Sequence, residues 1–150
     1  MKVSKKTRYG LRAMIEIASF FNEGALSAKS ISQYQDIPLQ YLEQILNRLK
    51  KEGLLKTIRG PRGGYILAKD PSKIRISNII EVLEGGDGLT ESTDSSKRAL
   101  SERAEFHSAS KFWEKLDKTI KKELSSTNLK DLCPKSSKQP HIKHNYAFEI

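Results

Sequence analysis

The sequence predicts a mainly α-helical fold with one small β-hairpin. Three observations support this prediction. Apolar residues recur at helical spacing in five segments, two short apolar runs flank a glycine-rich loop, and glycine or proline separates most of these segments. A chain of 150 residues can form one compact domain with an appended arm, but it is too short for a large multidomain enzyme.

The first two helices are expected at residues 9–22 and 28–35. In the first, the apolar residues share one helical face, and a glycine-containing turn follows it. In the second, Ser27 is a suitable N-cap, and Ile31 and Tyr34 point to the same side. These segments predict a medium and a short helix in succession.

A third helix is expected from Pro38 to Lys51, and it has two distinct faces. Pro38 suits the first turn because its missing N–H would have no partner there. The expected buried stripe is formed by leucines, namely Leu39, Leu42, Leu46 and Leu49. The other face carries amide, basic and aromatic side chains, namely Gln40, Tyr41, Gln44, Asn47, Arg48 and Lys51.

This polar face is typical of a helix that reads DNA. Amide side chains pair with adenine edges and guanidinium groups with guanine, and two short helices joined by a tight turn fit a major groove. On this pattern alone, an ordinary surface helix of a helical bundle remains an alternative.

Two strands are expected at residues 54–58 and 65–68. The loop between them, Arg59-Gly60-Pro61-Arg62-Gly63-Gly64, has the glycines and proline of a hairpin and presents two arginines. Glycine allows the backbone to approach a phosphate closely, and an arginine can enter a narrow minor groove. Helices and hairpin together predict a winged helix-turn-helix domain with a β-wing.

A fourth helix, residues 76–84, is expected to complete a DNA-binding domain at residues 1–84. We expect a flexible loop at 85–97, a long dimerisation helix at 98–125 and a poorly ordered tail at 126–150. The long helix has an apolar seam that a second copy would bury. Its folding back on its own domain is the alternative. The seam consists of Phe106, Ala109, Trp113, Leu116 and Ile120.

Charge supports the same division of the chain. Residues 1–84 hold 15 Lys and Arg against 8 Asp and Glu, whereas residues 85–150 hold 12 against 10. Such a bias attracts nucleic acid, anionic membranes or acidic proteins. The sequence has neither a transmembrane run nor a signal-peptide pattern, so we expect a cytoplasmic protein that does not bind membranes.

Three blocks of sequence carry a family resemblance. They are IPLQYLEQIL at 37–46, RGPRGGY at 59–65 and IIEVLEG at 79–85. With these blocks in this order, residues 1–124 resemble the Rrf-two family of bacterial winged helix-turn-helix transcriptional regulators. The resemblance implies a homodimer on double-stranded DNA, with recognition helices in adjacent major grooves and wings in the minor groove. We expect a repressor of a palindromic operator.

The resemblance also assigns roles to individual residues. Gln40, Tyr41 and Gln44 would face the groove, beside Asn47 and Arg48 of the same polar face. Arg59 and Arg62 would be contacts of the wing. Phosphate contacts are expected from helix N-termini and nearby side chains, namely Ser27, Lys29, Ser4, Lys5 and Tyr9.

The chain departs from the family pattern at its sensor. Sensing members carry three cysteines in the loop and early long helix that hold an iron–sulfur cluster. The matching positions here are Ser95, Ser101 and His107, and a serine oxygen is a poor replacement for thiolate on iron. We therefore expect no cofactor. Natural loss of the cluster explains all three positions, whereas engineered replacement of cysteine by serine would explain Ser95 and Ser101 alone.

The remaining candidate ligands are weak. The single cysteine, Cys133, excludes an internal disulfide and a metal site with several thiolates of one chain. A free, exposed side chain is its simplest interpretation, with redox sensing or intermolecular pairing as alternatives. His141 and His144 do not form a metal motif. No metal site is expected.

Two other classes of function fit the sequence less well. No motif for a nucleotide site, a nucleophile elbow or a paired-histidine metal site occurs, so we expect no enzyme. The alternative function is a protein-binding regulatory module that acts through its long helix on another protein. The sequence does not identify the signal, which a small molecule or a partner protein would provide.

Overall fold

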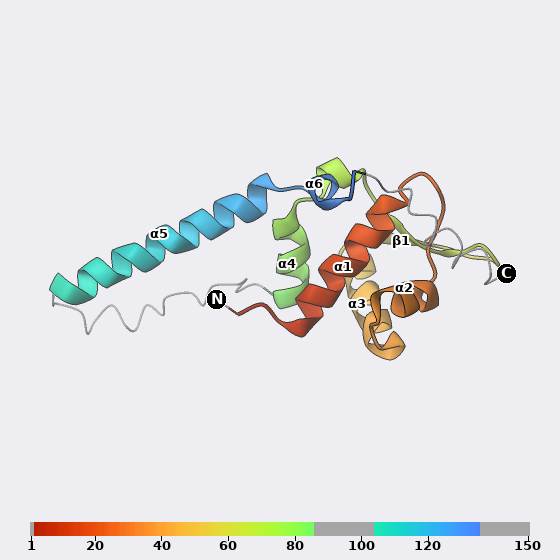
Figure 1. Ribbon diagram of the computed structural model, residues 1–150, viewed down its shortest axis with the longest axis horizontal. Coiled ribbons are helices and arrows are strands. Elements are labelled where there is room, and N and C mark those ends of the chain that lie inside the picture. Colours follow the sequence, from red (N-terminus) through yellow and green to blue (C-terminus); the bar gives the residue numbers. More distant parts are fainter. Residues whose placement is uncertain (1, 86–103, 136–150) are drawn as a thin grey trace.

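The computed structural model describes residues 2–85 and 104–135, with the backbone alone at 104–106. The predicted mainly α-helical fold with one hairpin is confirmed. Figure 1 shows the elements, which are α1 (Lys5–Ser19), α2 (Ala28–Gln35), α3 (Leu39–Lys51), β1 (Leu55–Ile58), β2 (Gly64–Leu67), η1 (Pro71–Lys73), α4 (Ile76–Glu84), α5 (Ala104–Ser126) and α6 (Leu129–Leu132).

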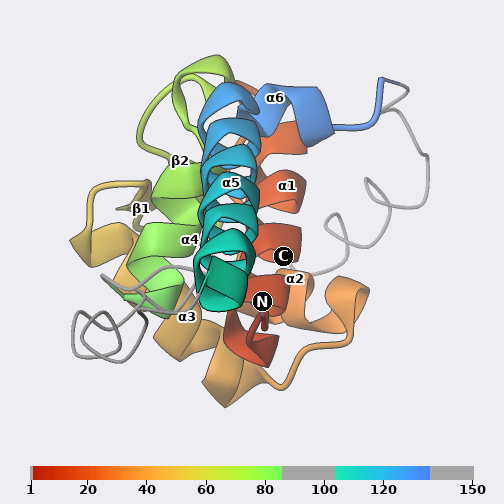
Figure 2. The same cartoon turned by 90° about the vertical axis from the view of Figure 1, so that its left-hand side faces the viewer.

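The described residues form a compact head and a projecting helix. The head contains α1 to α4, the hairpin, η1 and α6, whereas α5 extends away from it (Figure 1). Figure 2, which looks along α5 from its free end, shows the head behind that helix. The alternative that the long helix folds back along its own domain is therefore wrong in this structure.

The first helix begins earlier than its apolar pattern predicts, at Lys5 instead of Tyr9. Ser4 is the N-cap, and its hydroxyl accepts a hydrogen bond from the Thr7 N–H at 3.2 Å. The helix ends at Ser19, and a turn with Asn22 at φ 64° follows it. Capping therefore sets the start of α1 one turn before the apolar residues begin.

One apolar core holds the head together. On α3 the buried residues are Leu42, Ile45, Leu46 and Leu49. The predicted buried stripe was wrong at Leu39, which is the first residue of α3 and is 38% exposed. Ile45 is buried in addition to the three inner leucines. Tyr34, expected to share the face of the buried Ile31, is also 38% exposed.

A glycine allows α1 to pack closely against α3 and α4. A Cβ added to Gly10 would overlap the end of the Leu83 side chain and lie 3.2 Å from Ile45 Cγ2. These two neighbours belong to α4 and α3, and both are buried. A larger residue at this position would have to displace these two buried side chains.

The hairpin is an antiparallel pair with four aligned positions, from Leu55 opposite Leu67 to Ile58 opposite Gly64. Leu55 and Leu67 anchor its base in the core. At the other end, Ile58 is 47% exposed and the connecting loop extends beyond the head. The wing is thus fixed at one end and free at its tip.

Residues 126–135 are not the poorly ordered tail that the sequence predicts. Leu129 is fully buried in the core, and its N–H donates to the Ile74 carbonyl at 2.8 Å. Asn128 and Asp131 cap α6 reciprocally, each side chain accepting from the other's N–H at 3.0 Å. The predicted loop from residue 86 and the tail from residue 136, with His141 and His144, lie outside the described residues.

Candidate nucleic-acid interface

The turn between α2 and α3 fixes the angle at which α3 is presented. Asp36 adopts the left-handed conformation with φ 53°, and Ile37 after it is buried. The Ser32 hydroxyl donates to the Ile37 carbonyl at 2.5 Å. Pro38 is the N-cap of α3 rather than its first residue. These contacts hold the end of α2 against the start of α3.

The polar face of α3 is open to solvent, as the sequence predicts. Gln40, Gln44, Asn47 and Arg48 are all exposed, on the side opposite the buried leucines. Each amide group offers a hydrogen-bond donor and an acceptor, and the guanidinium group offers paired donors. Both patterns match the edges of base pairs in a major groove. The face can therefore read bases as well as hold phosphates.

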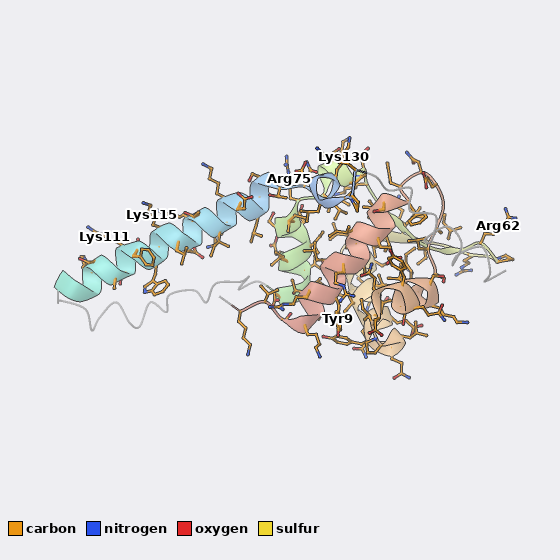
Figure 3. All side chains as sticks on the ribbon, in the orientation of Figure 1. Tyr9, Arg62, Arg75, Lys111, Lys115 and Lys130 are labelled. Carbon is orange, nitrogen blue, oxygen red and sulfur yellow. The ribbon has the colours of Figure 1, made fainter. Side chains whose placement is uncertain are left out.

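Tyr41 differs from its neighbours because it is half-buried. Its ring packs edge-on against Tyr9 of α1, with the ring centroids 5.8 Å apart. Figure 3 shows Tyr9 at the lower side of the head, beside α3. The two predicted site residues, 32 positions apart in the sequence, thus form one aromatic pair at the start of the recognition helix.

Arg12 is a residue of this region that the sequence did not reveal. Its guanidinium lies 5.6 Å from the centre of the Tyr9 ring. Its Nε donates to Gln35 Oε1 at 3.0 Å, and a terminal nitrogen donates to the Gln35 carbonyl at the end of α2. Arg12 therefore links α1 to the helix-turn-helix. An arginine on an exposed helical position gave no sequence signal of this role.

The wing is bonded to the segment before α2. Leu26 and Tyr65 exchange two backbone hydrogen bonds, at 2.7 and 3.0 Å. Gly64, at φ 147°, is required here because a Cβ would overlap the Leu26 carbonyl. Burial, and secondarily the charge of Glu43 on α3, raises the pKa of Tyr65. The wing is therefore held against the segment that leads into α2, with Glu43 of α3 close enough to influence Tyr65.

Both wing arginines are exposed. Arg59 follows β1, and Arg62 lies in the loop at the far end of the molecule (Figure 3). Arg62 therefore lies where a positively charged tip can reach a groove that the helices do not enter.

The predicted phosphate-binding residues fall into two groups. Lys5 and Lys29 are exposed, as such contacts require. The hydroxyls of the two serines are engaged within the protein. The Ser4 hydroxyl donates to Glu84 Oε1 at 2.7 Å, and the Ser27 hydroxyl accepts from the Ser30 N–H at 3.1 Å as the N-cap of α2.

Ser4 also attaches α1 to the end of α4. Its N–H donates to the same Glu84 oxygen at 3.0 Å. Partial burial raises the pKa of Glu84, but hydrogen bonds from Thr7 and Ser4, with the charge of Lys6, outweigh it and hold the pKa below its usual value. The carboxylate is therefore charged at neutral pH and fixes the start of α1.

The predicted seam of α5 is exposed in the described chain. Trp113 is 58% exposed and Leu116 is 39% exposed, while Ile120 is partly buried and Ala109 is exposed. The Phe106 side chain lies outside the described residues. Phe112, which the helical spacing did not single out, is 58% exposed and packs against Trp113 with a centroid distance of 5.2 Å. An aromatic pair so exposed is typical of an interaction surface.

The donors for an iron–sulfur cluster do not fit. The chain has one thiol, Cys133, which follows α6, whereas His107 lies near the start of α5. Ser95 and Ser101 lie outside the described residues. Among residues 2–85 and 104–135, no three His, Cys, Asp or Glu side chains form a possible metal site.

Cys133 is packed against the head rather than freely exposed. Its thiol donates to the Leu129 carbonyl at 3.4 Å. Burial raises the pKa of this thiol and outweighs a hydrogen bond with Ser19 that lowers it. Because the thiolate is the reactive form, this environment disfavours redox chemistry at Cys133.

A hollow of about 490 Å³ lies between the end of α3 and α4. Its floor includes the buried Leu54 and Ile74. Its rim carries cations from α3, from η1 and from the loop before η1, together with carboxylates and an amide, namely Arg48, Lys73, Lys69, Glu52, Glu81 and Asn78. It therefore mixes apolar surface with both signs of charge, next to the recognition helix.

Comparison with known proteins identifies the family. The Rrf2 profile, described as an iron-dependent transcriptional regulator, matches residues 3–135. The chain belongs to this family. The transcriptional regulator CymR of Bacillus subtilis is 40% identical over 133 residues, which is 89% of this chain and 90% of CymR. IscR of Photorhabdus laumondii is 35% identical over 88% of this chain and 79% of IscR.

Solved structures agree with the winged helix-turn-helix fold. The structure of CymR (YrzC), the global cysteine regulator of B. subtilis, has a TM-score of 0.73 at 39% identity and covers 88% of this chain and 95% of CymR. The structure of T. potens IscR has a TM-score of 0.67 at 39% identity and covers 88% of this chain and 85% of IscR. The chain is thus a DNA-binding transcriptional regulator and not an enzyme.

Nothing in the described chain is suited to crossing a lipid bilayer: the helices between residues 2 and 85 and between 104 and 135 are too short or too polar.

Proposed function

We propose that this member of the Rrf2 family is a cytoplasmic repressor that binds a palindromic operator as a homodimer. One observation supports this most directly. The row of exposed hydrogen-bonding side chains on α3 lies in a rigid frame with a wing that carries an arginine near its tip. A helix and wing so arranged contact a major groove and the adjacent minor groove of one duplex.

The residues of the interface have different tasks in this proposal. Gln40, Gln44 and Asn47 read base edges, and Arg48 contributes a base or phosphate contact beside them. Arg59 and Arg62 enter or line the minor groove. Cations and aromatic groups at the flanks hold the backbone, namely Lys5, Lys29, Tyr9 and Tyr41. Ser4 and Ser27 act through the helix N-termini that they cap.

Dimerisation through α5 is the second part of the proposal. Phe112 and Trp113 leave more than half of their surface exposed, and α5 projects beyond the head. A second copy of the chain would bury this surface and place a second α3 on the same duplex. Two-fold symmetry of the protein then favours a palindromic site.

Control by an effector, without a resident cluster, is the third part. With one thiol in the chain, the donor set lacks the thiolates that hold an iron–sulfur cluster. We propose that a small molecule or a protein provides the signal instead. A protein-binding module that acts through α5 without DNA is the second candidate function, and the exposed aromatic pair on that helix favours it.

The test is selection of duplex DNA by the purified chain, followed by comparison with Gln44→Ala. A palindromic consensus is expected. The variant should lose preference at one base pair per half-site, at a cost of about 1 to 3 kcal/mol, because its amide can no longer make paired hydrogen bonds. Binding to random DNA should change little.

Two results would contradict the proposal. An equal loss on operator and random DNA would exclude base reading by Gln44. Failure to enrich any sequence would favour the protein-binding module. Repression itself is tested by a reporter with the selected operator placed over its promoter, where the chain should lower transcription.

A further inference from the structure

Four lysines follow one face of α5. Lys111, Lys115, Lys118 and Lys122 are separated by four, three and four residues, and all are exposed. Side chains at this spacing align along one side of a helix because it turns once in about 3.6 residues. With Glu114 and Thr119 they line a shallow groove of about 310 Å³. We call the four residues the lysine stripe.

The lysine stripe faces away from the DNA-reading side of the head. Figure 3 shows Lys111 and Lys115 along the upper edge of the molecule, where Arg75 and Lys130 also lie, whereas Tyr9 lies below beside α3. On a helical projection at about 100° per residue, the stripe is opposite the seam residues Trp113 and Leu116. A copy that covers the seam would leave the stripe exposed.

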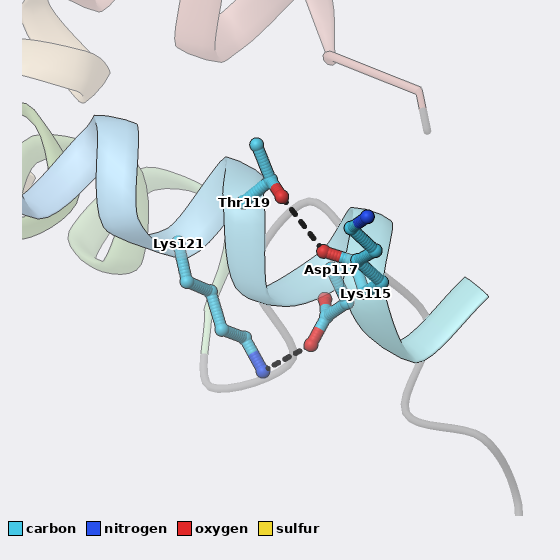
Figure 4. Close-up of polar contacts among 4 residues, drawn as sticks. All are labelled: Lys115, Asp117, Thr119 and Lys121. Atoms are coloured by element: carbon cyan, nitrogen blue, oxygen red, sulfur yellow. Dashed lines mark hydrogen bonds and ion pairs between the residues drawn. The ribbon is translucent and has the colours of Figure 1, made fainter. Parts of the chain in front are cut away.

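Within the described chain, no lysine of the stripe forms an ion pair, and Glu114 is the one carboxylate among the residues that line the groove. The ion pair of α5 there joins Lys121 to Asp117 at 2.8 Å, and neither belongs to the stripe (Figure 4). The Lys115 interaction in that figure is with its backbone carbonyl, which accepts from the Thr119 hydroxyl at 2.8 Å. Like charges four residues apart destabilise a helix, so this arrangement is not explained by the stability of α5.

We propose that the lysine stripe binds an acidic helix of a partner protein. Carboxylates at the same spacing on a second helix would lie opposite the lysines over about 16 Å, the length of eleven residues of α-helix. Charge complementarity of this kind sets the register and partner choice of paired helices.

The residues of the groove favour protein over nucleic acid. Glu114 lies among the lysines and would repel a continuous phosphate backbone, whereas a protein helix can place a single basic residue opposite it. The groove has neither arginine for paired phosphate contacts nor aromatic rings for stacking bases. Lysine alone provides separate point charges, which match separate carboxylates.

This binding goes beyond the proposed DNA reading and does not depend on it. The lysine stripe and α3 lie on different sides of the molecule, so an acidic helix and an operator are expected to bind together. The regulator would then be able to carry a protein effector while it occupies DNA.

The test uses the full chain and two synthetic helical peptides of identical composition. One peptide has Glu at the four matching positions, and in the other the same Glu residues are distributed around the helix. A fourfold variant removes the stripe by replacing each lysine with glutamine, namely Lys111→Gln, Lys115→Gln, Lys118→Gln and Lys122→Gln. Glutamine retains helix propensity close to that of lysine. A charge-matched control replaces four other exposed lysines, namely Lys2, Lys56, Lys121 and Lys135.

The wild-type chain should bind the patterned peptide at least tenfold more tightly than the scrambled one in fluorescence anisotropy at low salt. The stripe variant should lose this preference and the control should keep it. Circular dichroism checks that both variants remain helical. Equal affinity for the two peptides, or a preference that survives in the stripe variant, overturns the proposal.

Nucleic acid is a separate outcome of the same experiment. Random duplex DNA is titrated against the stripe variant and the control. If the stripe variant alone loses DNA binding and the wild-type chain does not distinguish the peptides, the surface binds nucleic acid and the proposal is wrong. Peptide binding is measured in the absence of DNA, so its outcome does not depend on base reading by α3. If an operator is selected, it should not displace the patterned peptide.

Discussion

The head and α5 use the same helical periodicity for opposite purposes. In the head, Leu42, Leu46 and Leu49 of α3 are fully buried by other elements of the chain. On α5, Trp113 and Leu116 follow an equivalent spacing but remain exposed at 58% and 39%. An apolar stripe therefore specifies that a face will be covered, whereas the architecture around it decides whether the covering surface comes from the same chain.

The largest expected effect on operator binding comes from a substitution on the exposed apolar face of α5. Trp113→Glu would place a carboxylate on the seam of α5, where burial by a second copy would remove it from water. We expect a monomer in sedimentation and an operator affinity at least about 100-fold lower, because the second half-site no longer adds avidity. The head should keep its melting temperature.

Ser125→Glu is the matched control, since Ser125 is exposed on the same helix and lies outside the seam. This variant should remain dimeric. A stable dimer of Trp113→Glu would show that another surface joins the copies and would remove the proposed difference between head and helix.

The next effect tests whether residues after α5 belong to the head. Leu129→Ala removes a fully buried side chain from the core and should lower the free energy of unfolding by about 2 to 5 kcal/mol in urea titration. Leu132→Ala, at a position that is 39% exposed, should cost much less. Equal losses would contradict the assignment of α6 to the core of the head.

A smaller effect concerns DNA binding by the wing. Arg62→Ala should weaken operator binding and reduce the slope of log affinity against log salt by about 0.9 for each phosphate that the arginine neutralises. Arg75→Ala removes the same charge at the upper edge of the molecule, away from the wing tip (Figure 3), and should leave that slope unchanged apart from long-range attraction. Matching slopes for wild type and Arg62→Ala would exclude Arg62 from the interface.

The smallest expected effect concerns the joint between α1 and α4. The pKa of Glu84 is lower in the folded protein than its usual value of 4.5, so the charged carboxylate stabilises the fold above that pH. This contribution disappears as the pH falls through the folded pKa. Glu84→Gln should therefore lower the free energy of unfolding by at most about 1 kcal/mol at pH 7, with little difference from wild type well below pH 4.

Denaturation in urea at several pH values measures this difference. Glutamine keeps an acceptor for Ser4 and so isolates the charge. A deficit that is constant from pH 7 to acid conditions would show that the charge is not the source of the stability.

Much of the fold could be predicted from the sequence because its signals are local. Ser27 marks the start of α2 through capping, and the two faces of α3 follow from helical spacing. The start of α1 was less predictable, since Ser4 precedes the apolar residues by a full turn. Leu129 could not be found from periodicity because α6 has only four residues, too few for a repeating pattern.

Candidate interface residues that act through their own exposed side chains could be predicted from the sequence. Those whose role depends on contacts between different elements were harder to predict. Exposed Gln40, Gln44 and Arg62 lie where their positions suggested. Arg12 was missed because its role depends on Tyr9 and Gln35, which only the tertiary structure brings to it. For the same reason the sequence did not show that the Ser4 and Ser27 hydroxyls are already bonded.

The attachment of α6 has a mechanical consequence. The Ile76 N–H donates to the Thr127 carbonyl, and the Leu129 N–H donates to the Ile74 carbonyl. These backbone hydrogen bonds clamp the chain just after α5 to the segment that leads into α4. A helix of 23 residues is about 35 Å long, so a rotation of roughly 5° at this clamp would move its far end by about 3 Å. In the proposed dimer, the stiffness of this clamp would therefore set how precisely the two heads are spaced along a duplex.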